Sequence, residues 1–126
     1  MRARVLISGG LLAMTAGLAA AEAPTSLDLQ GVVANKTVVL HTPAGGLPIS
    51  YSDNGTMVGR AKGMEFYTGS AYDRGTWWVV ANKLCHRWRS WLGGKDHCVT
   101  VKMESDTVHW KSSDGYSGTA TIGAKK

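Results

Sequence analysis

Short runs in which apolar and polar residues alternate recur along the chain from about residue 36 onward. Successive side chains of a β-strand point to opposite faces, so this alternation predicts strands with one buried and one exposed face. Turn residues separate the runs, as at Asp53-Asn54-Gly55 and Asp114-Gly115. The predicted strands are 36–41, 47–52, 56–61, 64–68, 76–81, 84–89, 97–103, 107–111 and 116–122.

The spacing of these runs predicts the fold class. Connections of two to five residues join neighbouring strands as antiparallel hairpins. We therefore expect an all-β antiparallel meander of eight or nine short strands. Such a meander hides its edges by closing fully or partly into a barrel, or alternatively by stacking as a two-sheet sandwich, and we favour the barrel. Residues 31–126 would form this single domain, and residues 22–30, which have few apolar side chains, a flexible lead-in.

The first 21 residues have the pattern of a secretory signal peptide. Arg2 and Arg4 precede a charge-free apolar stretch over residues 5–18, and the small residues Ala19 to Ala21 follow it. Cleavage after Ala21 would release a periplasmic or secreted protein without stable membrane insertion, since the apolar stretch is shorter than the ~20 residues that span a bilayer.

The charge of the chain gives little indication of a partner. The whole sequence has a formal net charge of +5, and cleavage would leave twelve of its fourteen basic residues against nine acidic ones. An exported chain with so small an excess and no basic stripe is not expected to bind nucleic acid. The partner would instead be an unknown small ligand or an envelope protein.

The segment from Cys85 to Cys98 is the most informative part of the sequence. Two cysteines in an oxidising compartment predict one disulfide. If they face each other on neighbouring strands, His86 faces His97 and Arg87 faces Asp96. Alternation then predicts an inner face with Leu84, His86, Trp88, His97, Val99, Val101 and Met103, and an outer face with Cys85, Arg87, Arg89, Asp96, Cys98, Thr100 and Lys102.

The facing pair His86 and His97 has two interpretations. Two imidazoles at cross-strand distance are candidate ligands for a transition metal. Alternatively they are structural, with hydrogen bonds to the backbone or to each other. No third ligand lies in the local pattern, because His109 falls on the polar side of its strand.

Tryptophan and arginine side chains near this hairpin supply the candidate ligand site. We expect it at a barrel mouth or a loop tip, formed by Trp78, Arg87, Trp88, Arg89 and Trp91. Trp91 either stands exposed in the hairpin tip as a binding residue or folds back over a hydrophobic cluster. Adjacent Trp77 and Trp78 must point to opposite faces. Three further aromatic residues are predicted in the core: Tyr51, Phe66 and Tyr116.

The sequence has no G-x-S-x-G, H-E-x-x-H, C-x-x-C or P-loop motif, so we expect neither an enzyme nor a cofactor. Its middle part, over residues 51–56, 75–77, 84–88 and 97–99, resembles a group of short secreted proteobacterial domains of unknown function. The Gly75-Thr76-Trp77 strand start is also similar to lipocalin and avidin-type barrels, although it lies in mid-chain here. The resemblance implies the fold and a disulfide, but no activity.

The favoured function is therefore an exported binding module for a small or envelope-associated ligand. The alternatives are a protein-interaction or enzyme-inhibitor module, and a periplasmic metal-binding domain that uses His86 and His97.

Overall fold

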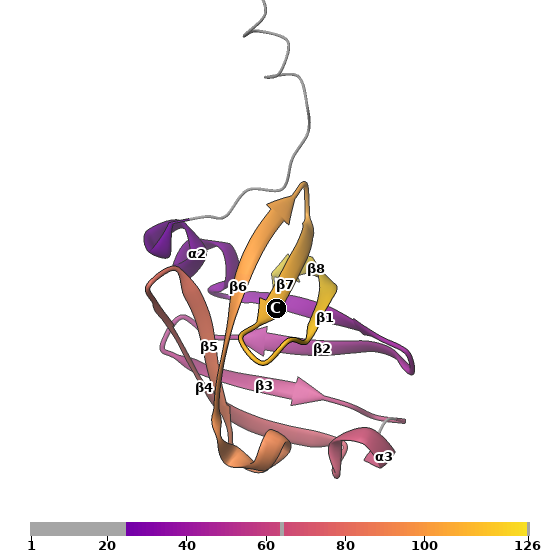
Figure 1. Ribbon diagram of the computed structural model, residues 1–126. Coiled ribbons are helices and arrows are strands. Elements are labelled where there is room, and N and C mark those ends of the chain that lie inside the picture. Colours follow the sequence, from indigo (N-terminus) through magenta and orange to yellow (C-terminus); the bar gives the residue numbers. More distant parts are fainter. Residues whose placement is uncertain (1–24, 64, 126) are drawn as a thin grey trace, which may run out of the picture.

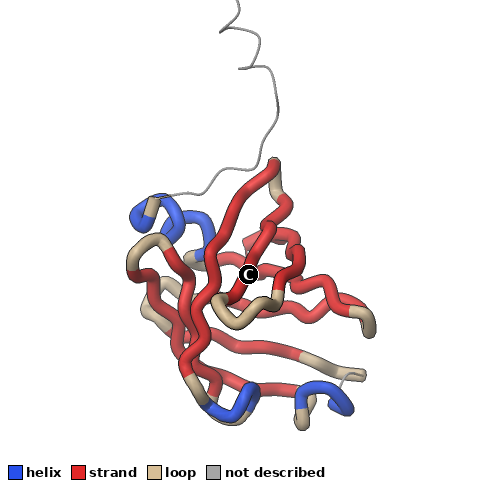
Figure 2. The backbone as a smooth tube through the Cα atoms, in the orientation of Figure 1, coloured by secondary structure: helices blue, strands red, loops and turns tan. Residues whose placement is uncertain are grey.

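In the computed structural model, residues 25–63 and 65–125 are described, and the predicted signal peptide lies outside them. Eight antiparallel strands form a closed barrel in which each strand pairs with the next and β8 pairs with β1 (Figures 1 and 2). The strands are β1 (Lys36–Thr42), β2 (Gly45–Tyr51), β3 (Thr56–Arg60), β4 (Tyr72–Val80), β5 (Lys83–Trp88), β6 (Asp96–Glu104), β7 (Thr107–Ser112) and β8 (Ser117–Lys125). The predicted all-β meander and the choice of a barrel over a sandwich are confirmed.

The closure between β1 and β8 removes the two free edges that a meander would otherwise leave. Val39 pairs with Thr121 and Leu40 with Ala120, and the register shifts between Lys36 and Val38. Every other strand pair joins neighbours in sequence, including the pairs β3–β4 and β5–β6, whose connections 61–71 and 89–95 are longer than expected.

One of the nine predicted strands, over residues 64–68, is wrong. The short helix α3 (Glu65–Thr68) lies there instead, in the connection between β3 and β4. Glycines on either side of it, Gly63 and Gly69, have φ of +86° and +90°, which extended strands do not allow. The Phe66 side chain is 93% exposed and not in the core, because the helix stands outside the barrel wall.

A second difference from the sequence prediction is the helix α2 (Ser26–Val33), which includes residues expected to form a flexible lead-in. The Thr25 hydroxyl accepts a hydrogen bond from the Asp28 amide at its start, and Lys36 Nζ donates to the Gly31 carbonyl at its end. Leu29 and Val33 are buried in the core. A helix of eight residues is too short for a clear helical period in the sequence, and the Thr25-x-x-Asp28 cap is the signal that marks it.

Helix α2 covers one end of the barrel, where it contacts β1, β4 and β5 (Figure 1). This is the end of the β2–β3, β4–β5 and β6–β7 connections, since alternate connections of a meander lie at opposite ends. The other end carries the β1–β2, β3–β4, β5–β6 and β7–β8 connections, including α3 and the 3₁₀ helix η1 (Trp91–Gly94).

Aromatic side chains fill the interior of the barrel. Tyr51, Trp77, Trp88 and Trp91 are each at most 5% exposed. Gly59 makes room for two of them, because a Cβ at this position would lie 2.3 Å from the Trp91 ring and 2.8 Å from the Trp88 ring. Tyr51 is in the core as predicted, but Tyr116 is 70% exposed, since it lies in the turn that precedes β8.

The described residues include no helix that is both long enough and apolar enough to cross a membrane.

Candidate functional site

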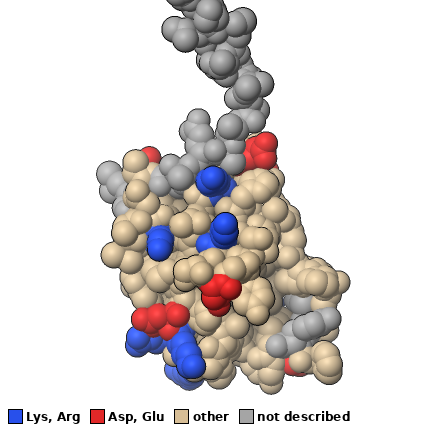
Figure 3. Space-filling view, viewed as in Figure 1, with Lys and Arg blue, Asp and Glu red and all other residues tan. Residues whose placement is uncertain are grey.

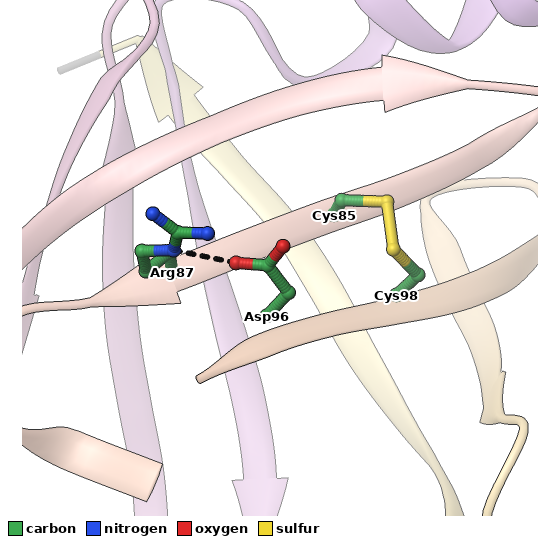
Figure 4. Close-up of polar contacts among 4 residues, drawn as sticks. All are labelled: Cys85, Arg87, Asp96 and Cys98. Carbon is green, nitrogen blue, oxygen red and sulfur yellow. Dashed lines mark hydrogen bonds and ion pairs between the residues drawn. A yellow bond between two sulfur atoms is a disulfide. The ribbon is translucent and has the colours of Figure 1, made fainter. Parts of the chain in front are cut away.

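The predicted hairpin between Cys85 and Cys98 is confirmed in detail. Cys85 pairs with Cys98, His86 with His97, and Arg87 with Asp96. The two cysteines form a disulfide, a bond typical of proteins in oxidising, extracytoplasmic compartments. Figure 4 shows the disulfide and the Arg87–Asp96 ion pair on one face of β5 and β6. The Arg87 Nε donates to Asp96 Oδ1 over 2.5 Å, with both side chains largely exposed.

The five residues of the predicted ligand site fall on two sides of the barrel wall. Arg87 and Arg89 are exposed on the outer face, and Trp78 lies directly opposite Cys85 of that face. Trp88 and Trp91 are each 5% exposed and point into the interior. The structure therefore separates the two arginines from the indoles of Trp88 and Trp91.

Trp91 folds back into the end of the barrel, which was one of its two expected positions. Its ring lies 4.7 Å from that of Trp88, measured between centroids. Its indole Nε1 donates to Ser70 Oγ at 3.0 Å. Asp73 holds the backbone here, since its Oδ2 accepts from the amides of Ser90 and Trp91 at 2.8 Å each.

The Asp73 carboxylate is 5% exposed, and its negative charge is stabilised locally. Burial alone raises the pKa of a carboxyl group, but the hydrogen bonds from Trp91, Ser90 and Arg74 lower the pKa of Asp73 by more. The ionised carboxylate thus connects β4 to η1.

His86 belongs to a polar and aromatic cluster inside the barrel. Its Nε2 lies 2.6 Å from the Tyr51 hydroxyl, and its ring is parallel to that of Trp88. Burial and then the nearby charge of His97 lower the pKa of His86 to about 4, although a hydrogen bond with the His97 backbone acts in the other direction. Burial raises the pKa of Tyr51 above its usual range.

The metal hypothesis for His86 and His97 finds no third ligand in this part of the molecule. Among residues 25–63 and 65–125, no three His, Cys, Asp or Glu side chains gather as a metal site requires. The His86 Nε2 already has Tyr51 as a partner, and His109 contacts Glu104 at 3.1 Å.

A hollow of about 540 Å³ lies on the outer wall of β3, β4 and β5, and not at a barrel mouth or loop tip. Three of its lining residues, Met57, Gly75 and Trp88, contribute to its floor from inward-facing strand positions. The outward-facing positions that surround them are Thr56, Val58, Arg74, Thr76, Arg87 and Arg89.

Strand register brings these outward-facing side chains together. Thr56 pairs with Thr76, and Thr76 with Arg87, which gives one row across three strands. Val58 pairs with Arg74 in the next row, and the Arg89 amide donates to the Arg74 carbonyl at 2.9 Å. The hollow thus has two hydroxyls in one row and arginines in both.

The charge around the hollow is predominantly positive. Arg74 Nη2 donates to the Tyr72 hydroxyl at 2.8 Å, and the guanidinium groups of Arg60 and Arg74 lie 5.6 and 5.7 Å from the Tyr72 ring. The hydrogen bond with Asp96, and then its charge, raise the pKa of Arg87. Figure 3 shows basic side chains beside acidic ones at the lower left, where β5 ends and β6 begins.

Of the residues that line this hollow, Arg87, Trp88 and Arg89 were predicted from the sequence as ligand-binding, whereas Arg74, Thr56 and Thr76 were not. All three occupy outward-facing positions. Thr56 and Thr76 lie in the predicted strands 56–61 and 76–81, and Arg74 lies just before the second of them. To predict that these side chains lie together would have required the register between β3 and β4, which no cysteine pair fixes.

Comparisons of this chain with protein-family models, with curated proteins and with solved structures found no match.

Proposed function

We propose that this protein is an exported binding domain that holds a small anionic ligand in the outer hollow of β3, β4 and β5. The observation that carries this proposal is the convergence of Arg74, Arg87 and Arg89 on a hollow of about 540 Å³ that also has two threonine hydroxyls. Guanidinium groups present planar sets of donors that match carboxylate and phosphate oxygens.

The size and chemistry of the hollow restrict the ligand class. Its volume falls within the range of about 300–1,000 Å³ typical of small-molecule sites. The Thr76 hydroxyl can donate or accept a hydrogen bond, and Val58 offers a small apolar contact. The Thr56 hydroxyl donates to Asn54 Oδ1 at 2.7 Å, so it can accept a hydrogen bond from a ligand. These groups fit a sugar that carries a phosphate or carboxylate.

The wall beneath the hollow is held in place by covalent and packing contacts. The disulfide joins β5 to β6, and the buried Trp88 ring packs beneath the end of β5. A rigid wall lowers the entropy lost when a ligand is bound. Two of the arginine side chains are also held, Arg87 by Asp96 and Arg74 by the Tyr72 hydroxyl.

Binding can be measured by NMR titration of the oxidised protein with glucose 6-phosphate and glucuronate, with glucose as the neutral probe. We expect both anions to shift the amide signals of β3, β4 and β5, and glucose to leave them unchanged. The double variant Arg74→Ala/Arg89→Ala should bind the anions at least about tenfold more weakly, since charged hydrogen bonds contribute about 1.5–3 kcal/mol each.

Lys102→Ala is the matched control, because it removes a positive charge from an exposed position on β6 outside the hollow. Equal weakening by Lys102→Ala and by the arginine variant would mean attraction to net charge only. The same conclusion would follow if the anions shifted signals all over the surface. Either result would reject the site.

A further inference from the structure

The exposed aromatic and aliphatic side chains of the barrel gather at one end. Five large apolar or aromatic residues of the described chain are strongly exposed: Phe66, Tyr72, Val80, Leu92 and Tyr116. All except Val80 lie in or beside the connections β3–β4, β5–β6 and β7–β8, which share the end opposite α2. We refer to this end, with Phe66, Leu92 and Tyr116 at its connections, as the apolar rim.

Leu92 shows that the rim has a specific local structure. Its φ of +55° and ψ of +31° are left-handed, a conformation that leucine rarely adopts. The hydrogen bonds of Asp73 to the amides of Ser90 and Trp91 fix the preceding backbone. As a result the Leu92 side chain is 60% exposed beside buried Trp91. An unfavourable conformation that projects an apolar side chain into water points to a use for that side chain.

Charge is distributed unequally between the two barrel ends. Within the described residues, α2 and the connections of its end carry Asp28, Asp53 and Asp106, while Glu104 ends β6 there and Lys36 and Lys83 begin β1 and β5. The connections of the rim carry Lys62, Arg89 and Lys95 against Glu65 and Asp114, and beside them Arg60 ends β3 and Asp96 begins β6. The excess is basic at the rim and acidic at the opposite end, so an anionic surface would attract the rim more strongly than the opposite end.

We propose that the apolar rim binds the surface of an anionic lipid bilayer. Phe66 and Leu92 would insert below the headgroups, and Lys62, Arg89 and Lys95 would contact the lipid phosphates. Short separate tips that each present one apolar side chain suit a fluid interface, in which no complementary pocket is required. Phenylalanine and tyrosine side chains are both suited to the interfacial region.

Insertion of the rim does not require the anion site in the hollow, although Arg89 belongs to both regions. A bilayer bound to the rim would also lie close to the hollow, because Arg89 lines the hollow and begins the β5–β6 connection. Yet the side chains expected to insert, Phe66 and Leu92, do not line the hollow. Variants of the two regions can therefore be tested separately.

The test is flotation of the oxidised protein, in the form in which the cell processes it, with vesicles of phosphatidylcholine and phosphatidylglycerol at 7:3. Intact mass confirms that all variants have the same N-terminus. We expect the double variant Phe66→Ser/Leu92→Asn to bind these vesicles at least about tenfold more weakly than wild type, because two apolar side chains can no longer insert. Asparagine is chosen because it adopts the left-handed conformation more readily than leucine.

Val80→Ser is the matched control, since Val80 is 52% exposed but lies at the α2 end of the barrel. It should bind vesicles as wild type does. Binding should also fall on pure phosphatidylcholine and at high salt. Hydrogen exchange on vesicles should protect residues 61–71 and 89–95.

Three results would each overturn the proposal: no binding by wild type, equal loss in the Val80→Ser variant, or protection elsewhere than in the two rim segments. A rim that leaves vesicles unbound but protects 61–71 and 89–95 in a protein complex would identify a protein partner in place of lipid. Glucose 6-phosphate binding by the Phe66→Ser/Leu92→Asn variant shows whether the hollow remains functional when the rim is changed.

Discussion

The Tyr51 hydroxyl and His86 Nε2 lie 2.6 Å apart inside the barrel and connect β2 to β5, two strands that do not pair with each other. A hydroxyl that donates to Nε2 requires this nitrogen to be unprotonated. The barrel interior therefore favours neutral His86, which agrees with the lowering of its pKa to about 4.

This relationship makes the stability of the protein sensitive to pH. Unfolding returns the pKa of His86 from about 4 to its ordinary value near 6.5, so the unfolded state binds more protons between these values. Stability is then fully present above about pH 6.5 and falls as the pH drops toward 4. We expect the free energy of unfolding in urea to be about 2 kcal/mol lower at pH 5 than at pH 7.5.

The variant His86→Gln isolates this contribution. It keeps a polar side chain of similar length beside Tyr51 but does not titrate. Its stability should change much less between pH 7.5 and pH 5 than that of wild type. An unchanged pH dependence in the variant would assign the effect to other groups.

The carboxylate of Asp73 should be required for the structure of the β5–β6 tip. Asp73→Ala removes the acceptor of the Ser90 and Trp91 amides, and we expect it to destabilise the fold by about 2–3 kcal/mol. Hydrogen exchange should be faster at these two amides in particular. Because the pKa of Asp73 is lowered in the folded state, its contribution is present at neutral pH and is lost in acid. Asp106→Ala, at an exposed position, should leave stability and exchange unchanged.

Gly59 should tolerate no side chain. In the variant Gly59→Ala the added Cβ would lie 2.3 Å from the Trp91 ring, so we expect a loss of about 1–3 kcal/mol and a changed tryptophan emission spectrum. Gly31→Ala is the matched control, because nothing lies within 4 Å of a Cβ there and alanine favours helix α2. It should be neutral or stabilising by up to about 1 kcal/mol. Similar losses in both variants would contradict the packing argument.

The disulfide should contribute strongly to stability. Cys85 and Cys98 are 13 residues apart, and closing a loop of this length stabilises a fold by about 3 kcal/mol through the unfolded state. The double variant Cys85→Ala/Cys98→Ala should lose about this amount in urea unfolding. A reducing agent should lower the stability of wild type but leave that of the variant unchanged, which separates loss of the bond from repacking around Cys85.

Most of the strands and the β5–β6 hairpin were predicted correctly from the sequence, whereas the short helices α2 and α3 were not. The period of two in apolar positions determined the strands and their buried faces, because alternation is a local property of extended backbone. Cys85 and Cys98 determined the register of β5 and β6, and with it the His86–His97 and Arg87–Asp96 pairs. Short connections determined the pairing of the other hairpins, whereas β3 and β4 pair across the longer connection 61–71.

The tertiary structure decided everything that depends on contacts between distant segments. Trp91 is buried because Gly59 on β3 leaves space for its ring and Asp73 on β4 holds its amide. Phe66 has a strand-like sequence context, yet glycines with positive φ on both sides keep it outside the wall. The outer hollow required the register of β3 on β4, since only that register places Arg74 beside Val58 and Thr76 beside Thr56. Such register is set by packing of the whole barrel, which no short stretch of sequence contains.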